Sequence, residues 1–133
     1  MEIGSVREES DFSFTSKMSF PILVGTLEKM GVESYRVDLT LQATCYCMVG
    51  GEVMSESFQF ETDIAEDFND GEIRAAISDS RSGRLDHKEF LKRIMGAGIS
   101  SYTIFLKGQK IVYYGRNGDS YIDNFPRANL NQH

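Results

Sequence analysis

The chain has 133 residues, enough for one domain with a buried core, and its apolar fraction of 41% and charged fraction of 26% are ordinary for soluble proteins. No apolar run approaches the roughly 18 residues of a membrane span, and the start of the chain lacks the basic and apolar stretches of a secretory signal. The net charge is -6, and no basic cluster exceeds two or three residues. The composition therefore argues against a membrane or nucleic-acid partner and favours a cytoplasmic protein.

The strongest pattern in the sequence is an internal repeat. Shifting the chain against itself by 67 residues aligns residues 6–54 with 73–121 without a gap, and nine of the 49 pairs are identical. Ordinary composition would give roughly three identical pairs by chance. We therefore expect a single domain over 1–133 with repeats at 6–54 and 73–121, an acidic connector at 61–72 and a flexible tail at 127–133.

The first repeat predicts a short helix near 6–14 and then a longer helix that begins at the N-cap Ser19. Apolar residues recur at helical spacing from Leu23 to Met30, and Gly31 ends the helix. The period then changes to the alternation of a strand, with Tyr35, Val37 and Leu39 directed to one side. A hairpin at Gly50 and Gly51 leads into a third strand around 52–60.

The second repeat predicts the same series of elements. Asn69 and Glu72 can cap a first helix, and Asp86 with Glu89 forms a capping box for a second helix that ends at Gly98. Three strands follow, at 102–106, 111–114 and 120–125. We therefore expect an α+β fold in which two tandem helix-helix-three-strand repeats form one mixed sheet of about six strands, with helices on one face.

The candidate binding residues lie on the strands and their turns. Arg36 and Asp38 face together, opposite the predicted core stripe, and the repeat places Thr103 and Phe105 at the corresponding positions. A charged pair without a counterpart is typical of a site added to a duplicated scaffold, and equally of an ordinary surface ion pair. Binding candidates on the sheet and its hairpin are Arg36, Asp38, Tyr46, Phe105, Tyr113 and Arg116.

Other chemistry-bearing residues have simpler interpretations. His87, next to Asp86 at the start of a helix, is expected to be a surface histidine whose pKa is lowered by the helix dipole. Cys45 and Cys47 are expected to be reduced and to serve packing, because residues two apart on a strand diverge too far for an easy disulfide. The segment 78–89 imitates a calcium loop but has serines at the positions where carboxylates are needed, so no metal site is expected.

Several motifs together resemble the YbcV/YdfO-like proteins, a small family of uncharacterised bacterial and prophage proteins. The motifs are SFP at 19–21, GVESYRVD at 31–38, FLKRIMGAG at 90–98, YYGRNG at 113–118 and FP at 125–126. This resemblance implies a compact α+β domain of unknown function, and some members carry the label "phage envelope protein". It brings no activity, cofactor or site residues to this chain.

The leading hypothesis is a non-enzymatic binding module that holds a protein partner or a small ligand on the open face of the sheet, without a cofactor. The structural requirements of the repeat explain the residue pattern, and no group of residues remains that resembles a catalytic site. The alternative is an enzyme with a cleft between the repeats, using Tyr46, Tyr113, Arg116 or His87. A third alternative is a homodimer formed through the sheet face or edge.

Overall fold

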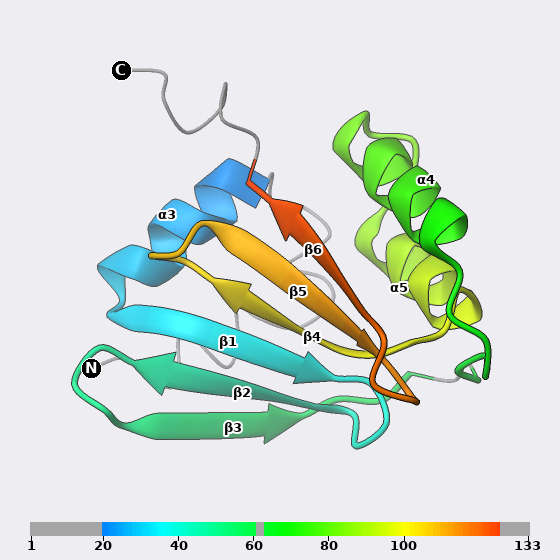
Figure 1. Ribbon diagram of the computed structural model, residues 1–133. Helices are drawn as coiled ribbons and strands as arrows, with labels where there is room; N and C mark the ends of the chain where they lie inside the picture. Colours follow the sequence, from blue (N-terminus) through cyan, green and yellow to red (C-terminus); the bar gives the residue numbers. More distant parts are fainter. Residues whose placement is uncertain (1–19, 61–62, 126–133) are drawn as a thin grey trace.

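The computed structural model describes residues 20–60 and 63–125 (Figure 1). The helix expected near 6–14, the Ser19 cap and the tail at 127–133 lie outside these residues. The order of elements is α3, three strands, α4, α5 and three strands. The bounds of α3 and α5, Phe20–Lys29 and His87–Gly96, differ by 67 residues, as do those of each strand and its later counterpart.

Six strands form a single sheet in the order β3-β2-β1-β4-β5-β6, which agrees with the expected α+β fold. Their bounds are β1 Val32–Asp38, β2 Ala43–Met48, β3 Val53–Ser57, β4 Ile99–Phe105, β5 Lys110–Gly115 and β6 Ser120–Asn124. We expected a mixed sheet, but all five pairings are antiparallel. At the centre, Arg36 of β1 lies opposite Thr103 of β4, 67 residues further on. A two-fold axis perpendicular to the sheet at this point would exchange β1 and β4, and such an axis requires the two strands to be antiparallel.

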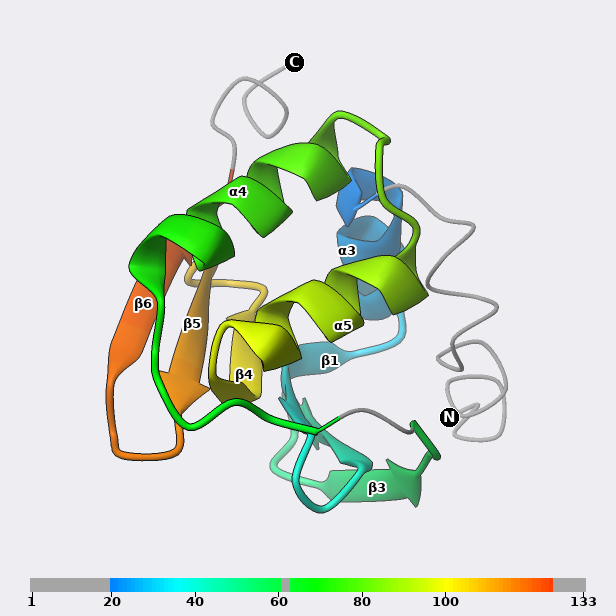
Figure 2. The ribbon, with the colours of Figure 1, turned by 90° about the vertical axis from the view of Figure 1, so that its right-hand side faces the viewer.

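The three helices of the described chain, α3, α4 (Asp70–Arg81) and α5, lie on one side of the sheet (Figures 1 and 2). Figure 2 shows that the sheet curls around them, so that its other side is convex. The predicted capping box is present, since the Glu89 amide donates to Asp86 Oδ1 at 2.8 Å and the Asp86 amide donates to Glu89 Oε1 at 2.9 Å. Asn69 caps α4 by accepting from the Glu72 amide at 3.0 Å.

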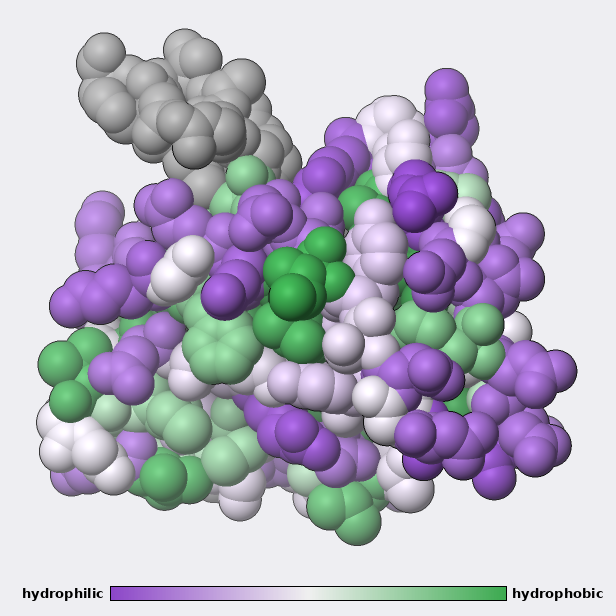
Figure 3. Space-filling view, viewed as in Figure 1, coloured by the Kyte–Doolittle hydropathy of each residue, from purple (hydrophilic) through white to green (hydrophobic). Residues whose placement is uncertain are grey.

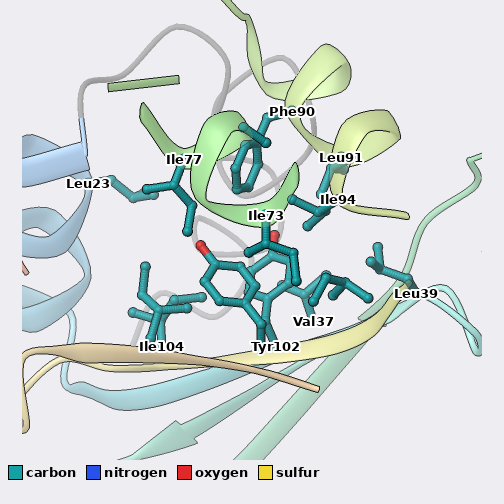
Figure 4. Packing of buried hydrophobic residues seen from close by; sticks show 14 of the residues in the cluster. Leu23, Val37, Leu39, Ile73, Ile77, Phe90, Leu91, Ile94, Tyr102 and Ile104 are labelled. Atoms are coloured by element: carbon teal, nitrogen blue, oxygen red, sulfur yellow. The ribbon is translucent and has the colours of Figure 1, made fainter. Parts of the chain in front are cut away.

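The core lies between the helices and the concave side of the sheet. The predicted stripe is confirmed, because Val37, Leu39, Tyr102 and Ile104 point from the strands toward the helices (Figure 4). The helical side chains packed over them are Leu23, Ile73, Ile77, Phe90, Leu91 and Ile94. Each fully buried large apolar side chain contributes roughly 1.5–3 kcal/mol by leaving water, so this layer supplies much of the driving force for folding.

Part of the expected acidic connector is packed against the domain. Helix α4 already begins at Asp70, and residues 63–69 run past the end of α5. The Ala65 and Asn69 amides donate to the carbonyls of Met95 and Ala97, both at 2.9 Å. The last carbonyls of a helix lack partners within the helix, and backbone amides of this segment supply partners here.

The packing of this segment makes Gly98 different from its counterpart Gly31. Both residues have a positive φ, +97° at Gly98 and +89° at Gly31, which strains any residue with a side chain. A Cβ at Gly31 would meet only Met48 Cε at 3.6 Å, whereas a Cβ at Gly98 would collide with the backbone carbonyl of Asp67.

We therefore expect Gly31→Ala to cost about 1–2 kcal/mol of unfolding free energy from backbone strain alone. Gly98→Ala should cost clearly more, because the backbone of residues 67 and 68 must also move away. Urea denaturation of the two variants and the parent chain measures both losses. Equal losses would contradict the close packing of residues 63–69 on α5 and β4.

Candidate functional site

The face of the sheet opposite the helices, here called the open face, consists of three rows of side chains that cross all six strands. The rows follow from strand register, since residues directly opposite one another point to the same side. From β3 to β6 they are Ser55, Cys45, Arg36, Thr103, Val112 and Ile122; Val53, Cys47, Ser34, Phe105, Lys110 and Asn124; and Ser57, Ala43, Asp38, Ser101, Tyr114 and Ser120.

The open face carries few charges compared with the rest of the chain. Its charged residues are Arg36, Asp38 and Lys110, two cations and one anion, which sum to +1, whereas the whole chain has a net charge of -6. Figure 3 shows hydrophobic and near-neutral side chains across the middle of this face, with most hydrophilic side chains toward its two sides. The outer strands add Val53 and Ile122, which are 60% and 55% exposed.

Arg36 and Asp38 are brought together at the centre of the open face, as expected. Arg36 Nη2 lies 3.4 Å from Asp38 Oδ2, with the Arg36 side chain half exposed. Asp38 Oδ1 also accepts from the amides of Thr40 and Leu41 at 3.0 and 2.9 Å, so this carboxylate holds the β1–β2 turn. The ion pair is partly exposed and contributes at most about 1 kcal/mol to the free energy of unfolding. Because the pair is weak and Arg36 is half exposed, its guanidinium is accessible for a partner.

Phe105 lies half buried on the same face, opposite Ser34 and Lys110. Phe105 was expected from the sequence, whereas Val53, Ile122 and Lys110 on the same face were not; of these three, Lys110 is its direct neighbour. Their alternation along the strands was visible in the sequence, but their place on the same face as Phe105 depends on strand order and register. Of the predicted candidates, the structure therefore places Arg36, Asp38 and Phe105 on one face, where only Arg36 and Asp38 are in contact.

Tyr46 and Tyr113 lie on the other side of the sheet, within the core. They are 3% and 2% exposed, and each packs against a second tyrosine, Tyr35 at 5.7 Å and Tyr102 at 5.5 Å between ring centroids. Burial is the main cause that raises the pKa of the Tyr113 hydroxyl, which stays neutral throughout the physiological range. The structure thus separates both tyrosines from Arg36.

Arg116 lies in the turn between β5 and β6 and is exposed. Its Nη1 donates to the carbonyl of Ile64 at 3.3 Å, so it supports the segment that runs past α5. The four residues of the enzyme hypothesis, Tyr46, Tyr113, Arg116 and His87, lie on four different elements of the fold.

His87, the first residue of α5, is half buried, and the expectation of a surface histidine was wrong. Burial lowers the pKa of His87 to about 4, although the Asp86 carboxylate acts in the opposite direction. The direction of this pKa change was predicted correctly, but its cause was assigned to the helix dipole, because burial cannot be read from the first turn of a helix alone.

Cys45 and Cys47 are free thiols, both half buried on the open face. Burial is the main cause that raises the pKa of Cys45, and Cys47 raises it further. In the segment that imitates a calcium loop, the Asp79 carboxylate accepts hydrogen bonds from Arg84 Nη1 at 3.0 Å and from Arg93 Nη1 at 3.3 Å. Among the residues that the structure describes, no three His, Cys, Asp or Glu side chains form a group able to hold a metal ion.

The fold and the open face define an α+β domain with one covered and one accessible side of a single sheet. The chain belongs to the family described as "Protein of unknown function (DUF1398)", whose match covers residues 7–123. No curated protein matches the sequence significantly. Within residues 20–60 and 63–125, no helix has the length and apolar character needed to cross a membrane. Membership of a family of unknown function agrees with what the sequence motifs implied.

The lowered pKa of the half-buried His87 predicts a specific pH dependence of stability. Its ordinary pKa is 6.5 and its folded pKa is about 4, so between these values the unfolded chain binds more protons than the folded one. Protonation of His87 should therefore remove stability as the pH falls from 6.5 to 4, by up to about 3.5 kcal/mol for about 2.5 pH units at about 1.4 kcal/mol each.

The variant His87→Asn should lose less unfolding free energy than the parent chain between pH 7 and pH 4.5, because asparagine does not titrate. Urea denaturation at both pH values gives the comparison. An identical pH dependence in the two proteins would show that His87 is not kept neutral by burial.

Proposed function

We propose that this chain is a cytoplasmic, non-enzymatic binding module that holds a protein partner on its open face. The observation that carries the proposal is the low charge of this face, three charged side chains among 18 positions, within an otherwise acidic chain. Exposed aliphatic side chains on the outer strands, Val53 and Ile122, extend the apolar character to both edges.

The shape of the open face favours a macromolecule over a small ligand. Small molecules bind in concave sites that enclose most of their surface, whereas this face is convex (Figure 2). A protein interface of standard size uses about 20–30 residues on each side, and the 18 positions of the open face approach this number.

Charge complementarity indicates the chemistry of the partner. Arg36 and Lys110 make the open face weakly cationic, while the rest of the chain repels acidic surfaces. The partner we propose is therefore a folded protein with an apolar surface that carries carboxylates opposite these two residues. We also propose that the chain belongs with the narrower group of YbcV/YdfO-like bacterial and prophage proteins, on the basis of the motifs at 31–38 and 113–118.

Two isoleucines with similar exposure allow a matched test of the open face. Ile122 is 55% exposed on the open face, and Ile22 is 60% exposed on α3, on the other side of the sheet. Either residue can be changed to serine at a cost within about 0.5 kcal/mol of stability.

In affinity capture with the tagged full-length chain from extracts of its natural host, Ile122→Ser and Arg36→Ala should each reduce recovery of the partner at least about tenfold, a loss of about 1.4 kcal/mol. Ile22→Ser should capture as much as the parent chain. Equal recovery by all the variants would contradict a role for the open face. Asp38→Ala is not a clean test, because it also removes the hydrogen bonds that hold the β1–β2 turn.

A further inference from the structure

The turn between β5 and β6 contains an asparagine that is followed directly by a glycine, Asn117 and Gly118. Both residues are exposed, and a Cβ placed on Gly118 would meet no atom within 4 Å. The side-chain amide carbon of an asparagine can be attacked by the main-chain nitrogen of the next residue. Glycine hinders this attack least, because it has no side chain and its backbone dihedrals are the least restricted.

The first repeat has the same turn without the asparagine. Gly50 and Gly51 occupy the corresponding positions, and the φ angles of Gly51 and Gly118 are +96° and +93°. In the first turn the Gly51 amide donates to the Met48 carbonyl at 2.9 Å. In the second turn the Gly118 amide donates to the Gly115 carbonyl at 3.3 Å, which is a longer and weaker hydrogen bond. The nitrogen that would attack the asparagine is therefore held loosely.

The other two asparagines of the described chain are held by their surroundings. Asn69 Oδ1 accepts a hydrogen bond of 3.0 Å from a main-chain amide in the first turn of α4. Asn124 lies in β6, and the amide that follows it, that of Phe125, donates to a carbonyl of the β4–β5 turn at 3.0 Å. The residues after both asparagines also carry side chains, which restrict the backbone. The β5–β6 turn is therefore the place where the structure leaves an asparagine open to this reaction.

We propose that Asn117 is a site of spontaneous deamidation. The main-chain nitrogen of Gly118 gives up its proton and forms a bond to Cγ of Asn117, while the side-chain nitrogen leaves with that proton as ammonia. Water then opens the cyclic imide at either of its carbonyl carbons, which gives aspartate or isoaspartate at this position. Water is the co-reactant, and no electron is transferred.

Both products change the edge of the sheet. Each places a new carboxylate next to Arg116, and isoaspartate also adds a carbon atom to the backbone of the turn. Among the described strands, β6 pairs only with β5, and this turn joins the two. Strand β6 carries Ile122, so the modification alters one side of the open face. The deamidation itself does not depend on the binding of a protein partner, and either proposal can fail alone.

The test is incubation of the native, full-length chain at mildly alkaline pH, followed by peptide mapping with mass spectrometry under acidic conditions. We expect deamidation at Asn117 to be at least about tenfold faster than at Asn69 or Asn124. A second readout is the transfer of a methyl group from S-adenosylmethionine to the isoaspartate of the aged chain by an isoaspartyl methyltransferase. Asn117→Gly is the matched control, because it reproduces the glycine pair of the first repeat. Methylation of this variant should fall at least about tenfold.

The unfolded chain in urea separates the effect of the turn from the effect of the sequence. We expect the rate at Asn117 in the native chain to lie within about tenfold of its rate in urea, and the rates at Asn69 and Asn124 to be reduced more strongly by folding. A native rate at Asn117 reduced as strongly as the other two would show that the folded hairpin protects it and would overturn the proposal. Equal methylation of Asn117→Gly and the parent chain would also overturn it, because the isoaspartate would then lie elsewhere.

Discussion

The pairing of β1 with β4 is the contact on which the rest of the structure depends. It joins two three-stranded meanders into one sheet. Helix α3 precedes the first meander in the chain, and α4 and α5 precede the second. Tyr35 lies opposite Ile104 and Val37 opposite Tyr102, so both strands direct their large side chains to the same side. Without this pair each meander would keep an exposed edge at its first strand, and unpaired backbone groups at an edge favour association with other chains.

The same pairing explains why the domain has one covered and one accessible face. Apolar and polar side chains alternate along both strands, and the register places the apolar side chains of both on the same side of the sheet. The three helices of the described chain cover that side of the curled sheet (Figure 2). The remaining rows, centred on Arg36 and Thr103, have no helix of the described chain above them. The feature we connect with function, the weakly cationic apolar surface, arises on these rows.

Much of the fold could be predicted because its signals are local. Asp86 and Glu89 lie three residues apart at the start of an apolar run, and the alternation from Tyr35 to Leu39 covers only five residues. The antiparallel contact of β1 with β4 was not predictable in this way, because it joins residues 67 apart and no local pattern records its direction. Strand register also determines that Phe105 and Lys110 lie side by side, which the sequence analysis could not establish.

The candidate site was predicted only in part, for similar reasons. The residues around Tyr46 and Tyr113 are moderately apolar on both sides of their strands, so the sequence does not indicate which side faces the core. Gln42 and Gln109 both adopt a φ of 58°, a left-handed conformation that glutamine rarely takes and that no sequence pattern predicted. The side chain of Gln42 forms two hydrogen bonds with the backbone of Phe60, a contact across 18 residues that compensates for the strain.

The accessibility of the open face is the central claim, and alkylation of the native chain tests it most directly. Cys45 and Cys47 are the only cysteines and both lie on this face, so a small thiol reagent followed by mass spectrometry reports on it without any substitution. The structure predicts slow labelling of both residues at a rate that does not change with low concentrations of urea, because the reaction needs no unfolding. A rate that rises with urea in proportion to the population of unfolded chain would place the two thiols in the core and contradict the account.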